Sequence, residues 1–273
     1  MEHRPSTILV VGATGSIGRF VVAEAARRGH TVRALTRRPQ QARFAAPVKT
    51  VGGDVTDPAT LGAAVDGIDA VVFTLGSDGQ GKTGAERIDY EGVRNVLLAL
   101  QGRPVRVALM TAIGVTNRDG DYNRSTEAHD WKRRSERLVR ASGLPYTIVR
   151  PGWFDYNDAN QHQLVMLQGD RRQAGNASDG VVARVQIARV LVHSLESDAA
   201  LGKTFELVAE QGPAQRDLDT VLAPLAADVI DASADASDLD AVQDQPNMPL
   251  AGEPSGVLAT LQALREQALA RGT

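Results

Sequence analysis

VVGATGSIGRF, residues Val10 to Phe20, carries three glycines between an apolar run and a helix-patterned stretch. Gly12 permits a sharp turn, Gly15 lets backbone amides approach a pyrophosphate, and Gly18 allows the helix to pack closely on the strand. The N-terminus of that helix offers unpaired N–H groups and a partial positive charge. The loop therefore predicts a dinucleotide phosphate site whose further contacts come from Thr14, Ser16 and Ile17. The alternative interpretation is a glycine-rich turn without a ligand.

Short runs rich in Val, Ile and Leu alternate with longer helix-patterned stretches through the first half of the chain. The runs span residues 7–11, 31–36, 48–53, 69–75, 105–110 and 146–150. Buried parallel strands read as near-continuous apolar runs, and parallel neighbours need crossover connections of the length found here. The sequence predicts an α/β fold with a doubly wound parallel sheet of the Rossmann type, which binds ligands at the carboxyl ends of its strands.

This pattern loosens toward the C-terminus. We expect residues 1–212 to form an NAD(P)-binding Rossmann domain that includes a small substrate-side appendage from about residue 151. Residues 213–273 form a C-terminal extension that ends in a further helix. Within it, residues 226–254 are rich in Ala and Asp, which predicts a weakly ordered acidic segment, with a peripheral helix as the alternative.

Composition excludes several classes of function. The formal net charge of −3 gives no reason to expect a surface that binds nucleic acid. The absence of cysteine excludes disulfides, thiolate metal sites and cysteine nucleophiles, and we expect no metal. No secretory leader and no long apolar segment is present, so we expect a cytoplasmic protein without a membrane partner. The partner is then a small-molecule acceptor, and the oligomeric state, monomer or dimer, stays open.

The end of the second run indicates which nicotinamide cofactor is used. NAD sites carry an acidic residue there, whereas an arginine accommodates the 2′-phosphate of NADP. This run ends in Thr36, Arg37 and Arg38 without an acid, so we expect NADP (NADPH) to be preferred over NAD. Arg37 is the expected ligand and Arg38 its support, the alternative being that one of the two is only a surface charge.

Two further segments come close to the same predicted crevice. Asp54 follows the third run, where its carboxylate can meet the adenine amino group while the next residue, Val55, offers its amide. Asp is also common in strand-to-helix turns, which is the alternative role. The end of the fourth run is expected to wall the cofactor through Thr74, Leu75 and Gly76.

The motifs GATGSIG, ALTRRP, GGDVTDP and SGLPYTIVRPG together resemble the atypical short-chain dehydrogenase/reductase superfamily, in its NAD(P)H-binding, NmrA-like and flavin-reductase-like branch. The resemblance covers about the first 210 residues. It implies that Thr111 occupies the usual serine or threonine position of the site and that Lys132 occupies the lysine position on the ribose. It also implies that Pro151 and Gly152 line the nicotinamide pocket.

The chain departs from that family at one decisive place. Members that reduce carbonyls use a tyrosine four residues before the lysine as a proton donor, and here that position is Ala128. His129, which shares the helix with Lys132, is a substitute acid or only a solvated histidine. Ordinary alcohol and ketone chemistry is therefore not expected.

Hydride transfer to a conjugated acceptor survives without that tyrosine, because a quinone or flavin delocalises the incoming charge. The sequence thus predicts an NADPH-dependent oxidoreductase whose acceptor stacks on Trp153, Phe154, Tyr156 and Met166. Core packing is the alternative role of these side chains. The competing functions are a non-catalytic NADP-binding redox sensor of the NmrA kind and a relative of the sugar-nucleotide epimerases.

Overall fold

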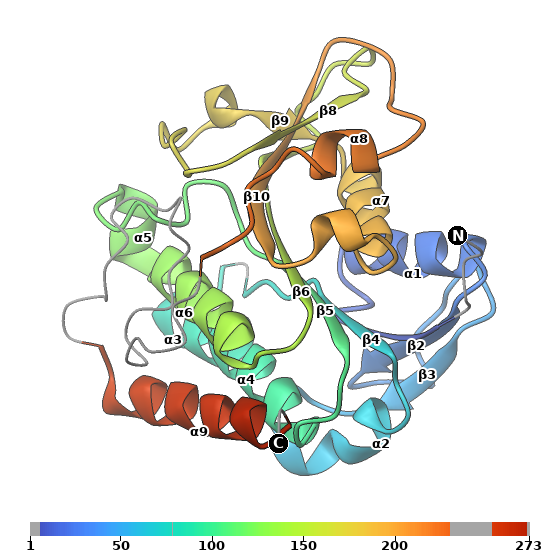
Figure 1. The fold of residues 1–273 in the computed structure, drawn as a ribbon, viewed down its shortest axis with the longest axis vertical. Helices are drawn as coiled ribbons and strands as arrows, with labels where there is room; N and C mark the ends of the chain where they lie inside the picture. The colour runs from blue at the N-terminus through green and yellow to red at the C-terminus, as the bar shows by residue number, and fades with distance from the viewer. Residues whose placement is uncertain (1–5, 78, 230–252, 272–273) are drawn as a thin grey trace.

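The computed structural model describes residues 6–77, 79–229 and 253–271. Its centre is an eight-stranded sheet in the order β3-β2-β1-β4-β5-β6-β10-β8 (Figure 1). The strands are β1 (Thr7–Val11), β2 (Thr31–Thr36), β3 (Lys49–Gly52), β4 (Ala70–Phe73), β5 (Arg106–Met110), β6 (Tyr146–Pro151), β8 (Gln163–Leu167) and β10 (Lys203–Glu210). Every pair is parallel except β10 with β8. Each of the six predicted runs forms a strand, and the expected Rossmann sheet is confirmed.

One face of the sheet is covered by helices α1 (Gly18–Arg27), α7 (Arg184–Ser194) and α8 (Asp219–Leu222) (Figure 1). Their apolar side chains share a core cluster with residues from the strands, including Ile8 and Val72. Strand order reverses between β1 and β4, the switch point at which such sheets bind dinucleotides. The loop between β1 and α1 therefore lies where the glycine pattern requires it.

The opposite face is covered by α2 (Gly62–Val65), α4 (Glu91–Ala99), α6 (Ala128–Ala141) and α9 (Ser255–Arg271). Two short helices, α3 (Gly81–Gly84) and α5 (Asp121–Thr126), lie at its edge, and a π-helical segment, Ala85–Tyr90, joins α3 to α4. Segments of π-helix are frequent at functional sites. This one packs against α6, the helix that carries Lys132.

The segment after β6 does not form a separate body. Strands β8 and β10 extend the main sheet, and only β7 (Trp153–Phe154) and β9 (Val181–Val182) form a small second sheet. Single 3₁₀ turns occur at Pro58–Thr60, Ala177–Asp179 and Asp198–Ala200. Among the described residues, none of the helices has the length and apolar character that crossing a bilayer requires.

Both described ends of the predicted acidic segment are bonded to α6, while residues 230–252 lie outside the described residues. The Asp228 carboxylate accepts hydrogen bonds from Arg140 at 3.3 Å and from the Tyr146 hydroxyl at 2.8 Å. Glu253 accepts from Arg134 at 2.7 Å. The predicted terminal helix is α9, which lies along α6 (Figure 1).

Candidate cofactor and substrate site

At two of the three glycines in the first loop, the surrounding protein leaves no room for a side chain. Gly12 has a φ of 87°, and a Cβ there would lie 2.8 Å from the carbonyl oxygen of Thr74, at the end of β4. A Cβ on Gly18 would collide with the Gly12 carbonyl. Gly12 thus allows the turn between the two central strands, and Gly18 lets α1 approach β1, as predicted from their spacing.

Gly15 has a different environment. The nearest atom to a Cβ at this position is the Gly12 carbonyl oxygen, at 3.1 Å. Thr14, Gly15 and Ser16 are exposed, whereas the Ile17 side chain is buried in the core. The backbone at the start of α1 therefore faces outward without a side chain over it, as an anion site at a helix N-terminus requires.

A pocket of about 320 Å³ lies beside this loop, lined by Thr14, Arg19, Thr36, Arg37, Arg38, Gln41 and Ala42. Arg37 and Arg38 are exposed and make no ion pair with any described residue. Arg19 is held by hydrogen bonds from its guanidinium to the carbonyl oxygens of Thr14, at 3.1 Å, and Arg43, at 2.9 Å. The sequence-based prediction missed Arg19, because its place on α1 does not reveal that it faces the end of β2.

Asp54 shows the turn-forming role that was its alternative. Its Oδ1 accepts hydrogen bonds from the amide and the hydroxyl of Thr56, both at 2.9 Å. Burial acts to raise the pKa of Asp54, but these hydrogen bonds and the charge of Arg37 hold that pKa below its usual value. The carboxylate therefore stays ionised near the arginine pocket, where it can also meet a ligand.

Two of the residues expected to contact the cofactor, Val55 and Leu75, lie close to Gly92 of α4. A Cβ at Gly92 would lie 2.7 Å from Leu75 Cδ1 and 3.2 Å from Val55 Cγ2. Thr74 is buried, with its hydroxyl donating to the Val11 carbonyl at 3.1 Å, and Gly76 is exposed. The ends of β3 and β4 thus approach one another across α4.

Lys132 lies close to a buried acid that the sequence-based prediction missed. Its ammonium is 2.5 Å from Oδ1 of Asp89, whose side chain is 1% exposed. The other carboxylate oxygen of Asp89 accepts from the Ser77 hydroxyl at 2.6 Å. Asp89 lies on the π-helical segment, so this segment positions the lysine that the family resemblance places on the ribose.

Thr111, directly after β5, is part of a buried polar network. Its hydroxyl donates to Oε1 of Glu136 over 2.7 Å, and Arg150 donates to the two oxygens of Glu136 at 2.9 and 2.5 Å. All three side chains are buried. The proton of the Thr111 hydroxyl is therefore directed toward Glu136.

The first turn of α6 explains what stands in place of the family tyrosine. Ala128 is 2% exposed, and its side chain packs in the hydrophobic core. His129 is half-buried, with Nδ1 3.4 Å from the Asn117 carbonyl and its ring 5.2 Å from that of Tyr122. Burial lowers the pKa of His129. The structure thus differs from the interpretation of His129 as a solvated surface histidine.

The residues after β6 divide into two groups. Pro151 is buried, and a Cβ on Gly152 would lie 2.5 Å from the Gly180 carbonyl, so this glycine is required for internal packing. Trp153 and Tyr156 are exposed and meet edge to face at 6.3 Å. Phe154 and Met166 pack on the core instead. The predicted aromatic wall is therefore an exposed pair and a core pair.

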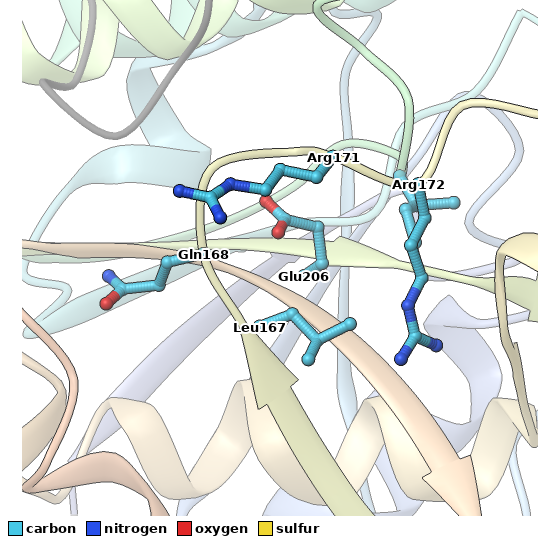
Figure 2. A pocket seen from close by; sticks show the side chains of 6 residues that line it. Leu167, Gln168, Arg171, Arg172 and Glu206 are labelled. Atoms are coloured by element: carbon cyan, nitrogen blue, oxygen red, sulfur yellow. The ribbon is translucent and has the colours of Figure 1, made fainter.

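A second pocket, of about 260 Å³, is lined by Ile113, Leu167, Gln168, Arg171, Arg172 and Glu206 (Figure 2). The amide of Ile113 donates to the Pro151 carbonyl at 3.0 Å, which places the pocket at the carboxyl ends of β5 and β6. It lies beyond Thr111 in the direction away from the glycine loop, because β10 and β8 follow β6 in the sheet. None of its lining residues was predicted from the sequence.

One group of potential metal ligands lies elsewhere. Ligand atoms of His193, Asp217 and Asp219 lie within 4.8 Å of one another. His193 Nε2 is already 2.8 Å from Asp219, and its Nδ1 is 3.4 Å from the guanidinium of Arg28, a cation that disfavours a metal. We assign no metal to this group.

The family model described as NAD(P)H-binding matches residues 12–198. The chain belongs to this NAD(P)H-binding family. Among similar proteins, it is 27% identical to the photosystem II assembly factor Ycf39 of Synechocystis, over 75% of this chain and 63% of that one. It is 36% identical to divinyl chlorophyllide a 8-vinyl-reductase of Zea mays, over 59% of this chain and 43% of the relative.

A solved structure agrees with the fold. The oxidoreductase ylbE from Lactococcus lactis is 20% identical and superposes with a TM-score of 0.64, covering 79% of this chain and 94% of the other. The resemblance to the atypical short-chain dehydrogenase/reductases is thus confirmed for family and fold. The chain spans only part of these relatives, 43% of the length of the reductase and 63% of the length of the assembly factor.

Proposed function

We propose that this chain is an NADPH-dependent oxidoreductase that delivers a hydride to a conjugated acceptor, such as a quinone or a flavin, without a tyrosine acid. The observation that carries the proposal is the pocket of Arg19, Arg37 and Arg38 beside the exposed backbone at Gly15. A pyrophosphate on the helix N-terminus would leave the 2′-phosphate of an adenosine within reach of three guanidinium groups. NADH lacks that phosphate, which is why we propose a preference for NADPH.

The remaining contacts follow the order of the strands. Asp54 and Val55 after β3 are the proposed adenine contacts, Thr74 to Gly76 after β4 the wall, and Lys132 the ribose ligand. The chemistry that NADPH supplies when bound is a hydride at its nicotinamide ring. Pro151 and Gly152 are the proposed boundary of the nicotinamide end, next to the pocket lined by Ile113 and Glu206.

The surroundings of Ala128 support a conjugated acceptor. This buried alanine holds the position from which family members donate a proton to a carbonyl, and the Thr111 hydroxyl is directed to Glu136. A quinone or flavin spreads the incoming negative charge over its ring and needs no fixed acid at the moment of transfer. The reductase among the relatives is consistent with such chemistry.

A non-catalytic NADP-binding regulator is the second candidate. The same buried alanine favours it, because a protein that only reports the redox state has no use for a proton donor. The relative named as an assembly factor agrees with this alternative.

Titration and turnover separate the two candidates. The purified chain is titrated with NADPH and with NADH in a calorimeter, and NADPH absorbance is then followed without oxygen after addition of a flavin or a water-soluble quinone. Oxidation of NADPH above the uncatalysed rate supports the oxidoreductase, provided that Gly15→Val, which blocks the loop, abolishes it. Tight NADPH binding without consumption by any acceptor supports the regulator instead. Equal affinity for NADH and NADPH contradicts the cofactor assignment.

A further inference from the structure

Two consecutive arginines, Arg171 and Arg172, line the pocket of about 260 Å³ at the carboxyl ends of β5 and β6. In Figure 2 their side chains leave the loop after β8 in different directions, with Glu206 between them. Arg171 is exposed and makes no hydrogen bond or ion pair with a described residue. The Arg172 guanidinium has two long contacts, a hydrogen bond to the Asp179 carbonyl at 3.5 Å and an approach of 4.0 Å to the exposed carboxylate of Glu210.

The loop that presents these arginines is held firmly by the residue before them. Asp170 is 1% exposed and has a positive φ of 46°, which is uncommon for a residue other than glycine. Its carboxylate accepts hydrogen bonds from the amides of Gly114, at 2.6 Å, and Thr116, at 2.8 Å. Gly114 directly follows Ile113 of the pocket wall. The strained Asp170 thus ties the two arginines to the end of β5, and such strain concentrates at functional sites.

Glu206 does not cancel the charge that the arginines present to the pocket opening. It is 2% exposed, and its carboxylate accepts from the Asp170 amide at 3.2 Å. Its other oxygen lies 3.5 Å from the buried guanidinium of Arg150. The Glu206 charge is therefore satisfied from within the protein, whereas the two arginines extend toward solvent.

We infer that Arg171 and Arg172 bind an anionic group, a phosphate or a carboxylate, on the hydride acceptor. This inference rests on the proposed function and names the class of its substrate: a conjugated ring that carries a negatively charged substituent. Guanidinium groups suit this task because they form paired, charge-assisted hydrogen bonds with planar or tetrahedral oxyanions. At about 260 Å³, the pocket suits one end of such a molecule, not the whole.

Matched acceptors test the inference. FMN and riboflavin share one ring system and differ by a phosphate, and a carboxylated naphthoquinone and 1,4-naphthoquinone differ by a carboxylate. We expect kcat/KM to favour the anionic member of at least one pair by roughly tenfold, the effect of a single charge-assisted contact. The pair that shows the larger preference identifies phosphate or carboxylate as the recognised group. Added salt should reduce the preference, because both arginines are exposed.

The variant Arg171→Gln/Arg172→Gln should remove this preference, with a much larger loss of kcat/KM for the anionic acceptors than for the neutral ones. Arg216→Gln is the matched control, since Arg216 is also exposed and lies in neither pocket. Equal kcat/KM for both members of both pairs in the native chain overturns the inference, as does a preference that persists in the double variant.

Binding without turnover separates this inference from the proposed function. FMN and riboflavin are titrated onto the chain loaded with NADP⁺, and quenching of flavin fluorescence is measured. Tighter binding of FMN that is lost in Arg171→Gln/Arg172→Gln supports the anion site even if no acceptor is reduced, in which case only the oxidoreductase proposal fails. Reduction of acceptors with equal affinity for the two flavins and equal kcat/KM for the two naphthoquinones leaves the oxidoreductase standing and rejects the anion site.

Discussion

The ammonium group of Lys132 lies 2.5 Å from a carboxylate oxygen of Asp89, 43 residues earlier in the chain. The acid is almost fully buried and the lysine is 15% exposed, so the pair lies at the boundary of the interior. Asp89 is further held by the Ser77 hydroxyl, and its own carbonyl accepts from Ser135 at 2.5 Å on the same helix as the lysine. The pair therefore joins the π-helical segment to α6 and keeps the lysine in one place.

Removal of the lysine alone should be costly. Lys132→Met leaves the Asp89 carboxylate buried without its cation, and we expect a loss of about 3–5 kcal/mol in the free energy of unfolding, measured by urea titration. Asp89→Asn/Lys132→Met should regain much of that loss, because neither charge is left. If the single and the double variants unfold at the same urea concentration, the pair does not have this structural role.

Arg37→Ala should weaken the binding of NADPH and leave that of NADH nearly unchanged. The lost contact is a charge-assisted hydrogen bond, so the expected change is about 1.5–3 kcal/mol in binding free energy by calorimetry. Arg19→Ala should act in the same direction, since Arg19 lines the same pocket. Arg216→Ala, at an exposed position outside the pocket, is the control. Equal losses for NADH and NADPH would remove Arg37 from the 2′-phosphate site.

Substitutions at Gly18 and Gly15 of the first loop should have different effects on stability and on cofactor affinity. Gly18→Ala forces a Cβ against the Gly12 carbonyl, and we expect destabilisation of about 1–3 kcal/mol. Gly15→Ala places its Cβ 3.1 Å from the Gly12 carbonyl oxygen, a tight contact that a small shift relieves, so we expect a smaller loss of stability than in Gly18→Ala. Cofactor affinity should fall more strongly in Gly15→Ala, because the new Cβ lies on the exposed side that would face the proposed pyrophosphate. Unchanged NADPH affinity in Gly15→Ala would argue against the loop as the phosphate site.

His129 should make stability depend on pH below about 6.5, the ordinary pKa of histidine. Burial lowers its pKa in the folded chain, so the unfolded chain binds the proton first. The stabilisation is thus fully present above about pH 6.5 and is lost as the pH falls toward the folded-state pKa. Urea unfolding between about pH 5 and pH 7 should therefore show a smaller decrease for His129→Gln than for the native chain. His162→Gln, at an exposed histidine, is the control and should keep the native pH dependence.

Local patterns in the chain were sufficient to predict the sheet and the conformation of the glycine loop after β1. Each run from 7–11 to 146–150 forms a strand. β1, β4, β5 and β6 are buried along most of their length, as apolar runs predict, whereas β3 is an edge strand without a buried residue. The roles of Gly12 and Gly18 could be predicted because both depend on atoms within a few residues and on the strand beside them.

Residues distant in the chain could not be placed in this way. Nothing in the sequence indicates that Arg19 of α1 lines one pocket with Arg37, that Asp89 meets Lys132, or that Glu206 lies between Arg171 and Arg172. The same limit affected Phe154 and Met166, whose aromatic or apolar character suits a ligand wall and a core equally well. Backbone geometry depends on residues that are close in the sequence, so the sequence alone predicts it. The partner of a charged side chain depends on which helices and strands pack together, so only the tertiary structure decides it.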